Sequence, residues 1–127
     1  MILVDTSVWI EHFRRGNDEL EGLLKAERVL IHPYVIGELV LGNFRNQVAV
    51  ISAIMKLPQA PVIFHGELLH FVNREALSGS GIGYVDAHLL AAARIRQGAA
   101  LWTRDKSLHA AAEKLGLAAS QRDIGVY

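Results

Sequence analysis

The stretch that decides the fold is MILVDTSVWIEHF, residues 1–13. Its residues Ile2–Val4 form a short continuous apolar run, which is typical of a strand buried on both faces of a parallel sheet. Thr6 or Ser7 is then in position to cap a helix that runs to about Arg15. A buried strand that leads directly into a helix predicts the start of an α/β fold.

The rest of the chain continues this alternation of strands and helices. Asp18 and Glu21 form a variant of the capping box and predict the start of a second helix. We expect helices at about 6–15, 18–26, 33–43, 46–57, 66–77, 85–97 and 105–115, and strands at 2–4, 29–31, 62–64 and 99–103. This order predicts one domain over residues 1–127, an α/β three-layer sandwich with a short central parallel sheet flanked by helices.

The composition excludes several classes of protein. With 51% hydrophobic and 20% charged residues, the chain is not intrinsically disordered. Its 13 basic and 13 acidic residues give a net charge of zero, so no overall positive field indicates a nucleic-acid partner, although a local basic patch remains open. The absence of cysteine excludes disulfides, zinc–thiolate sites and thiol nucleophiles.

The apolar segments do not predict a membrane protein. The chain enters its first strand at once, so we expect no signal peptide. The longest apolar region, residues 29–44, is interrupted by Pro33, Glu38 and two glycines, so we expect no membrane span. We therefore expect a cytoplasmic protein.

Three acidic residues stand in apolar surroundings. Asp5 ends the first strand, Glu38 is the only Asp, Glu, Lys or Arg in residues 29–44, and Asp86 is the only one in residues 76–93. Charged side chains are rarely buried unless they are paired or bind a metal. Each acid taken alone also has a structural explanation. Asp5 could cap the first helix, Asp86 could interact with a helix dipole, and Glu38 could form a buried salt bridge with an arginine.

The positions of the acids favour a shared site. In open parallel sheets, ligands bind beyond the carboxyl ends of the strands. Asp5 lies at such an end, and Asp105 follows the predicted strand at 99–103. If Glu38 and Asp86 lie in the same cleft, it holds four carboxylates. These would repel one another unless a cation compensated their charge. All-oxygen ligands select a hard ion, so the sequence predicts a Mg²⁺ site in which Mn²⁺ substitutes.

Four segments resemble a known family. MILVDTSVWIEHF, PYVIGELVLG around Glu38, VDAHLLAAA at Asp86 and LWTRD at Asp105 are together similar to PIN-domain ribonucleases, especially the VapC-like toxins of bacterial toxin–antitoxin modules. The resemblance spans nearly the whole chain in the family's order. It implies that Asp5, Glu38, Asp86 and Asp105 are the catalytic metal ligands. It also implies that Thr6 and Thr103 orient metal-bound water or an acid.

The resemblance implies an activity and partners as well. The activity would be hydrolysis of RNA by a metal-activated water, leaving a 3′-hydroxyl and a 5′-phosphate. The partners would be a cognate antitoxin whose tail covers the cleft and a second copy in a homodimer. The apolar stretch at 34–57 is compatible with such an interface and equally with ordinary core.

Basic residues near the predicted site are candidates for substrate contact. They lie near the acid-bearing strand ends or at the end of the first helix, and they are Arg14, Arg15, Arg104 and Lys106. They could hold RNA phosphates, or they could simply be solvated residues near helix ends.

Other functions fit the sequence less well. His65 and His70 are five residues apart, so on a helix they point about 140° apart and cannot share a zinc ion. We expect the histidines at positions 12, 32 and 109 on the surface or in an interface. A haloacid-dehalogenase-like phosphatase would need an aspartate at position 7, where this chain has Ser7. A catalytically silent PIN-like module that binds RNA or protein remains the alternative, and the four intact acids argue against it.

Overall fold

The computed structural model describes residues 1–125 and has a parallel sheet at its centre. Its strands are β1 (Ile2–Val4), β2 (Val29–Leu30) and β3 (Ala100–Trp102), in the order β2-β1-β3. β1 pairs with both neighbours, so that Ile2 lies opposite Val29 on one side and Ala100 on the other. The first strand of the chain is therefore the middle strand of the sheet.

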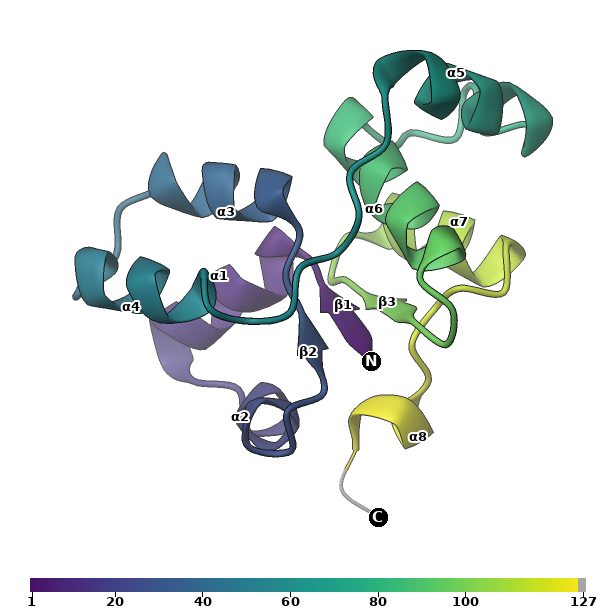
Figure 1. The fold of residues 1–127 in the computed structure, drawn as a ribbon. Coiled ribbons are helices and arrows are strands. Elements are labelled where there is room, and N and C mark those ends of the chain that lie inside the picture. The colour runs from purple at the N-terminus through teal and green to yellow at the C-terminus, as the bar shows by residue number, and fades with distance from the viewer. Residues whose placement is uncertain (126–127) are drawn as a thin grey trace.

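Helices cover both sides of this sheet. They are α1 (Thr6–Arg15), α2 (Asp18–Lys25), α3 (Pro33–Val40), α4 (Gln47–Ile54), α5 (His65–Arg74), α6 (Tyr84–Ile95), α7 (Lys106–Lys114) and α8 (Gln121–Ile124). Figure 1 shows α1 to α4 on one side of the sheet and α5 to α7 on the other. The predicted three-layer α/β fold with a short parallel sheet is confirmed.

The core is built around β1 and α6. All three residues of β1 are buried, as the apolar run predicts. Every residue of α6 from Ala87 to Ala93 is also buried, and a helix that is apolar nearly all round is expected in a protein interior. These two elements carry Asp5 and Asp86 at their ends, so the most rigid part of the fold positions two of the candidate acids.

The structure corrects two predicted helix caps. Asp5 occupies the N-cap position of α1 without a side-chain cap, and Thr6 and Ser7 lie inside the helix. Asn17, rather than Asp18, caps α2 by accepting a hydrogen bond from the Leu20 amide at 2.9 Å. Asparagine is among the best N-cap residues, so Asn17 takes the cap position and Asp18 becomes the first residue of the helix.

The structure also differs from the predictions along residues 41–64 and at the end of the chain. α3 ends at Val40 because the Gln47 side chain donates to carbonyls of its last turn, and a loop follows at residues 41–46. The predicted strand at 62–64 is wrong. A single bridge pairs Ile31 with Gln59 instead, so residues 62–64 have no place in the sheet. The short helix α8 was not predicted.

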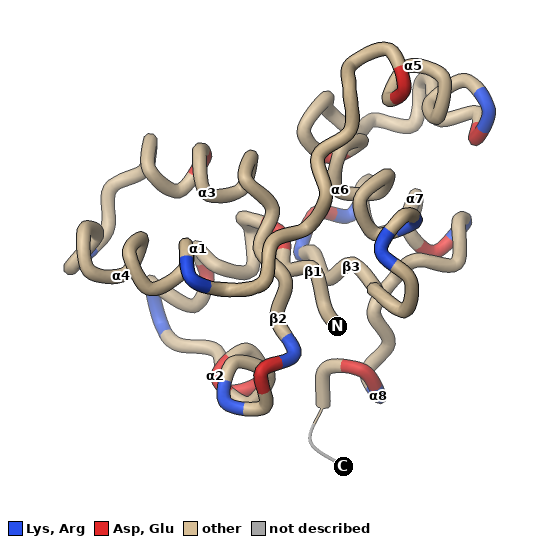
Figure 2. Tube along the Cα trace, in the orientation of Figure 1, with Lys and Arg blue, Asp and Glu red and all other residues tan. Residues whose placement is uncertain are grey.

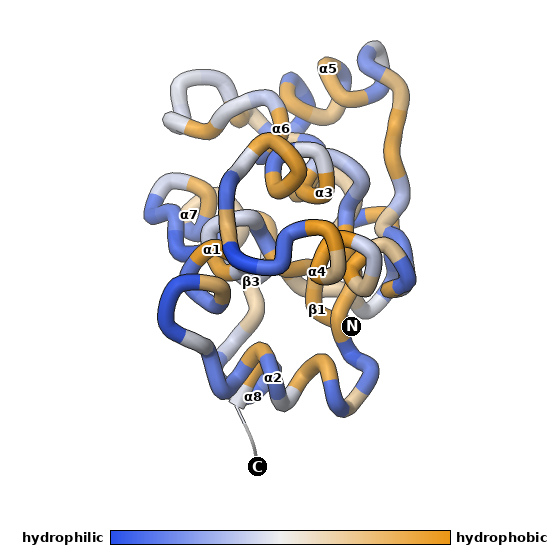
Figure 3. The backbone as a smooth tube through the Cα atoms, turned by 90° about the vertical axis from the view of Figure 1, so that its left-hand side faces the viewer, coloured by the Kyte–Doolittle hydropathy of each residue, from blue (hydrophilic) through white to orange (hydrophobic). Residues whose placement is uncertain are grey.

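The surface carries mixed charge and, over α3 and α4, exposed apolar side chains. Basic and acidic residues alternate over the helices, without a face of one sign in the view of Figure 2. Figure 3 shows apolar segments on α3 and α4 turned toward the viewer. Leu41 and Val48 there are 90% and 87% exposed, so part of the apolar stretch at 34–57 lies outside the core. Within residues 1–125, no helix is both long and apolar enough to cross a membrane.

Candidate active site at the carboxyl ends of β1 and β3

Asp5 is the most firmly held of the candidate acids. It follows β1, and its amide donates to the Trp102 carbonyl at 2.9 Å, which extends the pairing of β1 with β3. The side chain is only 6% exposed. Its Oδ2 atom accepts hydrogen bonds from the Ser7 and Thr103 hydroxyls, both at 2.7 Å. These two donors compensate the buried carboxylate and fix its orientation.

The same hydroxyls connect the ends of the two strands. Thr103 Oγ1 accepts from the Asp105 amide, and Ser7 Oγ accepts from the Arg104 amide, each at 3.0 Å. Asp105 in turn caps α7 by accepting from the Leu108 amide at 2.9 Å. Sequence reasoning missed Ser7 as a site residue. The signal available was a hydroxyl two residues after a strand-ending aspartate, which is within reach of the same carboxylate.

Glu38 reaches the site from α3. Its Oε1 atom accepts from the Thr6 hydroxyl at 2.6 Å, so Thr6 contacts an acid as expected. Glu38 is exposed and forms no ion pair within residues 1–125, so the alternative of a buried salt bridge is wrong. Its neighbours Val35 and Leu39 are buried, because they lie on the face of α3 that packs into the core. The apolar residues on either side of Glu38 in the sequence therefore do not mean that Glu38 itself is buried.

Asp86 lies in the first turn of α6, where its Oδ2 atom accepts from the Gly83 amide at 3.0 Å. Burial raises the pKa of Asp86 above its usual value, and the Gly83 hydrogen bond opposes this effect. The negative charges of Asp5, Asp105 and Glu38 raise the pKa further. The four acids therefore lie near enough to one another for their charges to interact, and the surface around them is called the acidic groove below.

The carboxylates leave oxygen atoms free for a ligand. Each of the four acids uses one oxygen in the hydrogen bonds above. The second carboxylate oxygen of each acid accepts no hydrogen bond from residues 1–125. These acids are Asp5, Glu38, Asp86 and Asp105. In the same part of the chain, no three histidine or acidic side chains stand close enough to hold an ion together. Mg²⁺ usually takes one or two carboxylates and completes its shell with water and phosphate, so the donor chemistry fits such an ion.

The four predicted substrate-binding cations fall into two groups. Arg15 and Arg104 both pair with Glu11, at 3.1 and 3.0 Å, and the hydrogen bond from Arg104 is the main cause that lowers the pKa of Glu11 to about 2. Arg14 and Lys106 are exposed and unpaired within residues 1–125. Arg14 lines a pocket that also contains Glu38, and Lys106 directly follows Asp105.

The rings of His32 and His88, with those of Tyr34 and Tyr84, form a cluster that we call the histidine cluster. His88 packs edge-on against Tyr34 and Tyr84, with ring centroids 4.8 and 4.7 Å apart. His32 is fully buried within the chain, so the prediction that it lies on the surface or in an interface is wrong. It caps α3 by accepting from the Tyr34 amide at 3.0 Å. That role explains why a histidine precedes Pro33 at the start of this helix.

Comparisons with known proteins show the family of this chain. The family model described as PIN domain matches residues 2–114. The chain is 46% identical over 121 residues to Ribonuclease VapC32 of Mycobacterium tuberculosis, from strain CDC 1551 / Oshkosh and from strain ATCC 25618 / H37Rv. Each match covers 95% of this chain and 98% of the relative. The chain belongs to the PIN-domain family and, within it, is VapC-like.

Proposed function

We propose that this protein is a metal-dependent ribonuclease toxin whose catalytic residues are Asp5, Glu38, Asp86 and Asp105, with Thr6 and Thr103 as positioning residues. The observation that carries the proposal is the hydrogen-bonded end of β1 and β3, where the Ser7 and Thr103 hydroxyls hold the carboxylate of Asp5 and Thr103 accepts from the amide of Asp105. Resemblance to Ribonuclease VapC32 supports RNA as the substrate.

The acids on their own would repel the substrate. An RNA phosphodiester is an anion, and four carboxylates around one groove oppose its approach. A Mg²⁺ or Mn²⁺ ion bound by their free oxygens would remove this repulsion, lower the pKa of an attacking water and offset the charge that develops on the phosphate. Asp5, Glu38, Asp86 and Asp105 are the residues that would hold it, one or two directly and the others through water, since no three of them in residues 1–125 stand close enough to bind one ion directly.

The chain's own residues prepare this groove in advance. Ser7 and Thr103 fix one oxygen of Asp5, and Thr6 fixes one oxygen of Glu38, so both carboxylates are oriented before any ligand arrives. Such preorganisation is the main source of electrostatic catalysis. Arg14 and Lys106 lie at the rim as phosphate contacts, whereas Arg15 and Arg104 shape the rim through Glu11. We propose products with a 3′-hydroxyl and a 5′-phosphate, following the family pattern.

We also propose the partners that the resemblance implies, namely a cognate antitoxin and a second copy of the chain, and a cytoplasmic location. The exposed apolar side chains of Leu41 and Val48 support a protein partner, because large apolar patches are uncommon on free surfaces.

The test is cleavage of an end-labelled single-stranded RNA by the purified protein with Mg²⁺, with Mn²⁺ and with EDTA. We expect cleavage with either cation, none with EDTA, and strong loss in Asp5→Asn. Asp18→Asn is the matched control, since it removes an exposed acid of α2 that lies outside the site. Equal cleavage by wild type and Asp5→Asn would overturn the assignment of the site. Binding of RNA without cleavage under all conditions would instead support the silent module.

A further inference from the structure

A pocket beside the acidic groove has the composition of a nucleotide site. It lies between α1, the end of α3 and the loop at residues 41–46, and its volume is about 350 Å³. Pockets of roughly this size, from about 300 Å³ upward, accommodate small organic ligands. Glu38, one of the four acids, is part of its wall. The pocket is therefore continuous with the proposed cleavage site.

Two arginines give this pocket a positive charge. Arg14 comes from α1 and Arg45 from the loop, and both are exposed. Neither forms an ion pair within residues 1–125, in contrast to Arg15 and Arg104, which Glu11 neutralises. Unpaired guanidinium groups are well suited to phosphate oxygens, which they bind through two parallel hydrogen bonds.

An aromatic pair supplies the apolar part of the pocket. Phe13 and Phe44 stack with their ring centroids 4.3 Å apart and an interplanar angle of 15°. The loop that carries Phe44 and Arg45 is also held by Gln47, whose side chain donates to the Gly42 carbonyl at 3.0 Å. The pocket is thus formed before a ligand arrives. Unpaired bases in RNA are commonly bound on aromatic side chains and on the planes of arginines.

We propose that this pocket binds one unpaired nucleotide next to the scissile phosphate. Phe44 and Phe13 contact the base, and Arg14 and Arg45 contact the backbone phosphate. The inference rests on the proposed ribonuclease function and adds to it a binding position for one nucleotide beside Glu38. A base inside a duplex is stacked and paired, so it cannot enter the pocket without leaving the helix.

The test compares Arg45→Ala and Phe44→Leu with wild type on a short single-stranded oligoribonucleotide in the presence of Mg²⁺. We expect KM to rise roughly tenfold in Phe44→Leu, because stacking of a base contributes about 1–3 kcal/mol, while kcat stays near wild type. Arg45→Ala also raises KM. It reduces the slope of log binding constant against log salt concentration by about 0.7, the value for one phosphate contact on a single strand.

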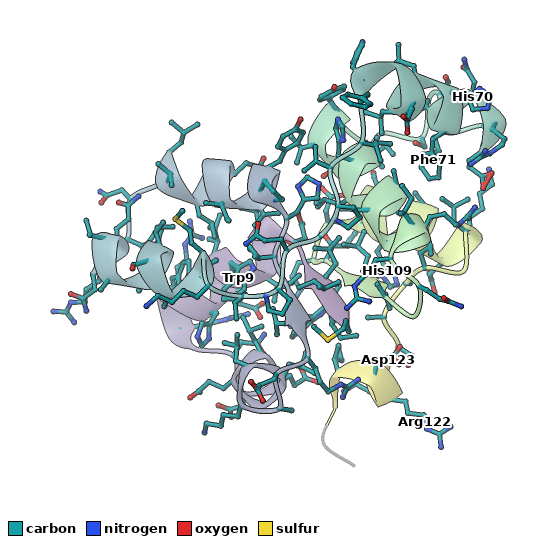
Figure 4. The ribbon with its side chains drawn as sticks, viewed as in Figure 1. Trp9, His70, Phe71, His109, Arg122 and Asp123 are labelled. Carbon is teal, nitrogen blue, oxygen red and sulfur yellow. The ribbon has the colours of Figure 1, made fainter. Side chains whose placement is uncertain are left out.

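The control is Arg122→Ala, which removes one exposed positive charge on α8, at the end of the molecule opposite α5 in Figure 4. We expect it to leave KM and the salt slope unchanged. Circular dichroism and thermal melting report whether Phe44→Leu remains folded. Arg45 is exposed, so its substitution provides an independent test if Phe44→Leu unfolds.

A second measurement separates this inference from the ribonuclease proposal. Fluorescence anisotropy of the same labelled oligonucleotide with Ca²⁺ in place of Mg²⁺ reports binding whether or not cleavage occurs. The inference is overturned if KM, binding and the salt slope are unchanged in Arg45→Ala and Phe44→Leu. It is also overturned if the two changes weaken only the binding of a protein partner. A wild-type protein that binds the oligonucleotide through the pocket but never cleaves it contradicts the ribonuclease proposal alone.

Discussion

Helix α6 contributes one residue to each of two clusters of titratable side chains. The two clusters differ in burial, hydrogen bonding and charge. Asp86 joins the acids of the groove, where each carboxylate keeps an oxygen free of protein donors. His88, two residues later, joins His32 in the interior, and the two rings are 1% and 0% exposed. Within residues 1–125, His32 Nε2 and both nitrogens of His88 have no hydrogen-bond partner. The contrast teaches that access to solvent and ions, rather than residue type, decides which cluster can do chemistry.

The electrostatics of the two clusters follow from this difference. Burial lowers the pKa of His32 to about 4, with a smaller contribution from His88, and it also lowers the pKa of His88 itself. The histidine cluster is therefore uncharged near pH 7. In the groove, burial and then the charges of Asp5, Asp105 and Glu38 raise the pKa of Asp86, so its ionised form carries a cost that a cation can relieve. The histidine cluster is structural, and the acidic groove is suited to binding an ion.

The largest expected effect comes from Asp86→Asn. Removing one carboxylate of the groove should reduce cleavage by a factor on the order of 10² to 10³, the usual result of losing one preorganised electrostatic contact. The same change should raise the melting temperature in EDTA. The raised pKa of Asp86 means that the fold disfavours its charged form, and asparagine can still accept from Gly83. Parallel loss of activity and stability would show that Asp86 is structural.

The next largest effect concerns acid pH and His32. Because folding lowers the pKa of His32, the unfolded chain binds a proton more readily, so stability falls as pH drops from about 6.5 toward 4. The loss should approach roughly 3 kcal/mol at about 1.4 kcal/mol per pKa unit. Urea unfolding at pH 7 and pH 4.5 measures it. The control His32→Asn keeps a residue able to cap α3 but does not titrate, and its stability should depend less on pH. An equal pH dependence in both proteins would refute the role of His32.

A smaller effect is expected from Ser7→Ala, because Ser7 orients Asp5 without belonging to the acids themselves. Loss of its hydrogen bond should weaken cation affinity by about 10- to 100-fold, as for other residues that hold a metal ligand in place. The Mn²⁺ concentration that gives half-maximal cleavage reports this loss, and kcat at saturating Mn²⁺ should change less. Ser52→Ala, an exposed serine of α4, is the control. An unchanged Mn²⁺ requirement in Ser7→Ala would mean that the hydroxyl of Ser7 does not position Asp5.

The smallest effect is expected at His88. Both of its ring nitrogens are buried, and neither has a hydrogen-bond partner in the described part of the chain. His88→Leu therefore replaces a polar group that makes no hydrogen bonds there with an apolar one. Such replacements are often neutral or stabilising, and the free energy of unfolding should change by less than about 1 kcal/mol. A loss above about 2 kcal/mol in urea unfolding would reveal a hydrogen bond of His88, for example to buried water.

Much of the fold could be predicted from short apolar runs and from helix-ending residues. The run Ile2–Val4 predicted the central strand, and the alternation along the chain predicted the parallel sheet. The strand expected at 62–64 failed because three apolar residues look alike in a strand and in an extended loop. A segment joins the sheet only where its backbone pairs with a neighbouring strand. Here Gln59 pairs with Ile31, although the segment around Gln59 has no strand pattern.

The site could be predicted only in part, because a sequence shows neighbours along the chain and not the direction of a side chain. Apolar surroundings suggested that Glu38 was buried, yet it is exposed on the edge of α3. The same reasoning placed His32 outside, although it is fully buried at the start of that helix. Ser7 and Arg45 were missed because their importance depends on contacts with residues from other elements.

Direct titration of the protein with Mn²⁺, followed by the electron paramagnetic resonance signal of the free ion, tests whether the four acids form a cation site. We expect wild type and Asp18→Asn to bind Mn²⁺ alike, with Mg²⁺ competing, and Asp5→Asn and Asp86→Asn to bind it much more weakly. Equal binding by all four proteins, or no binding by the folded wild type, would contradict the account.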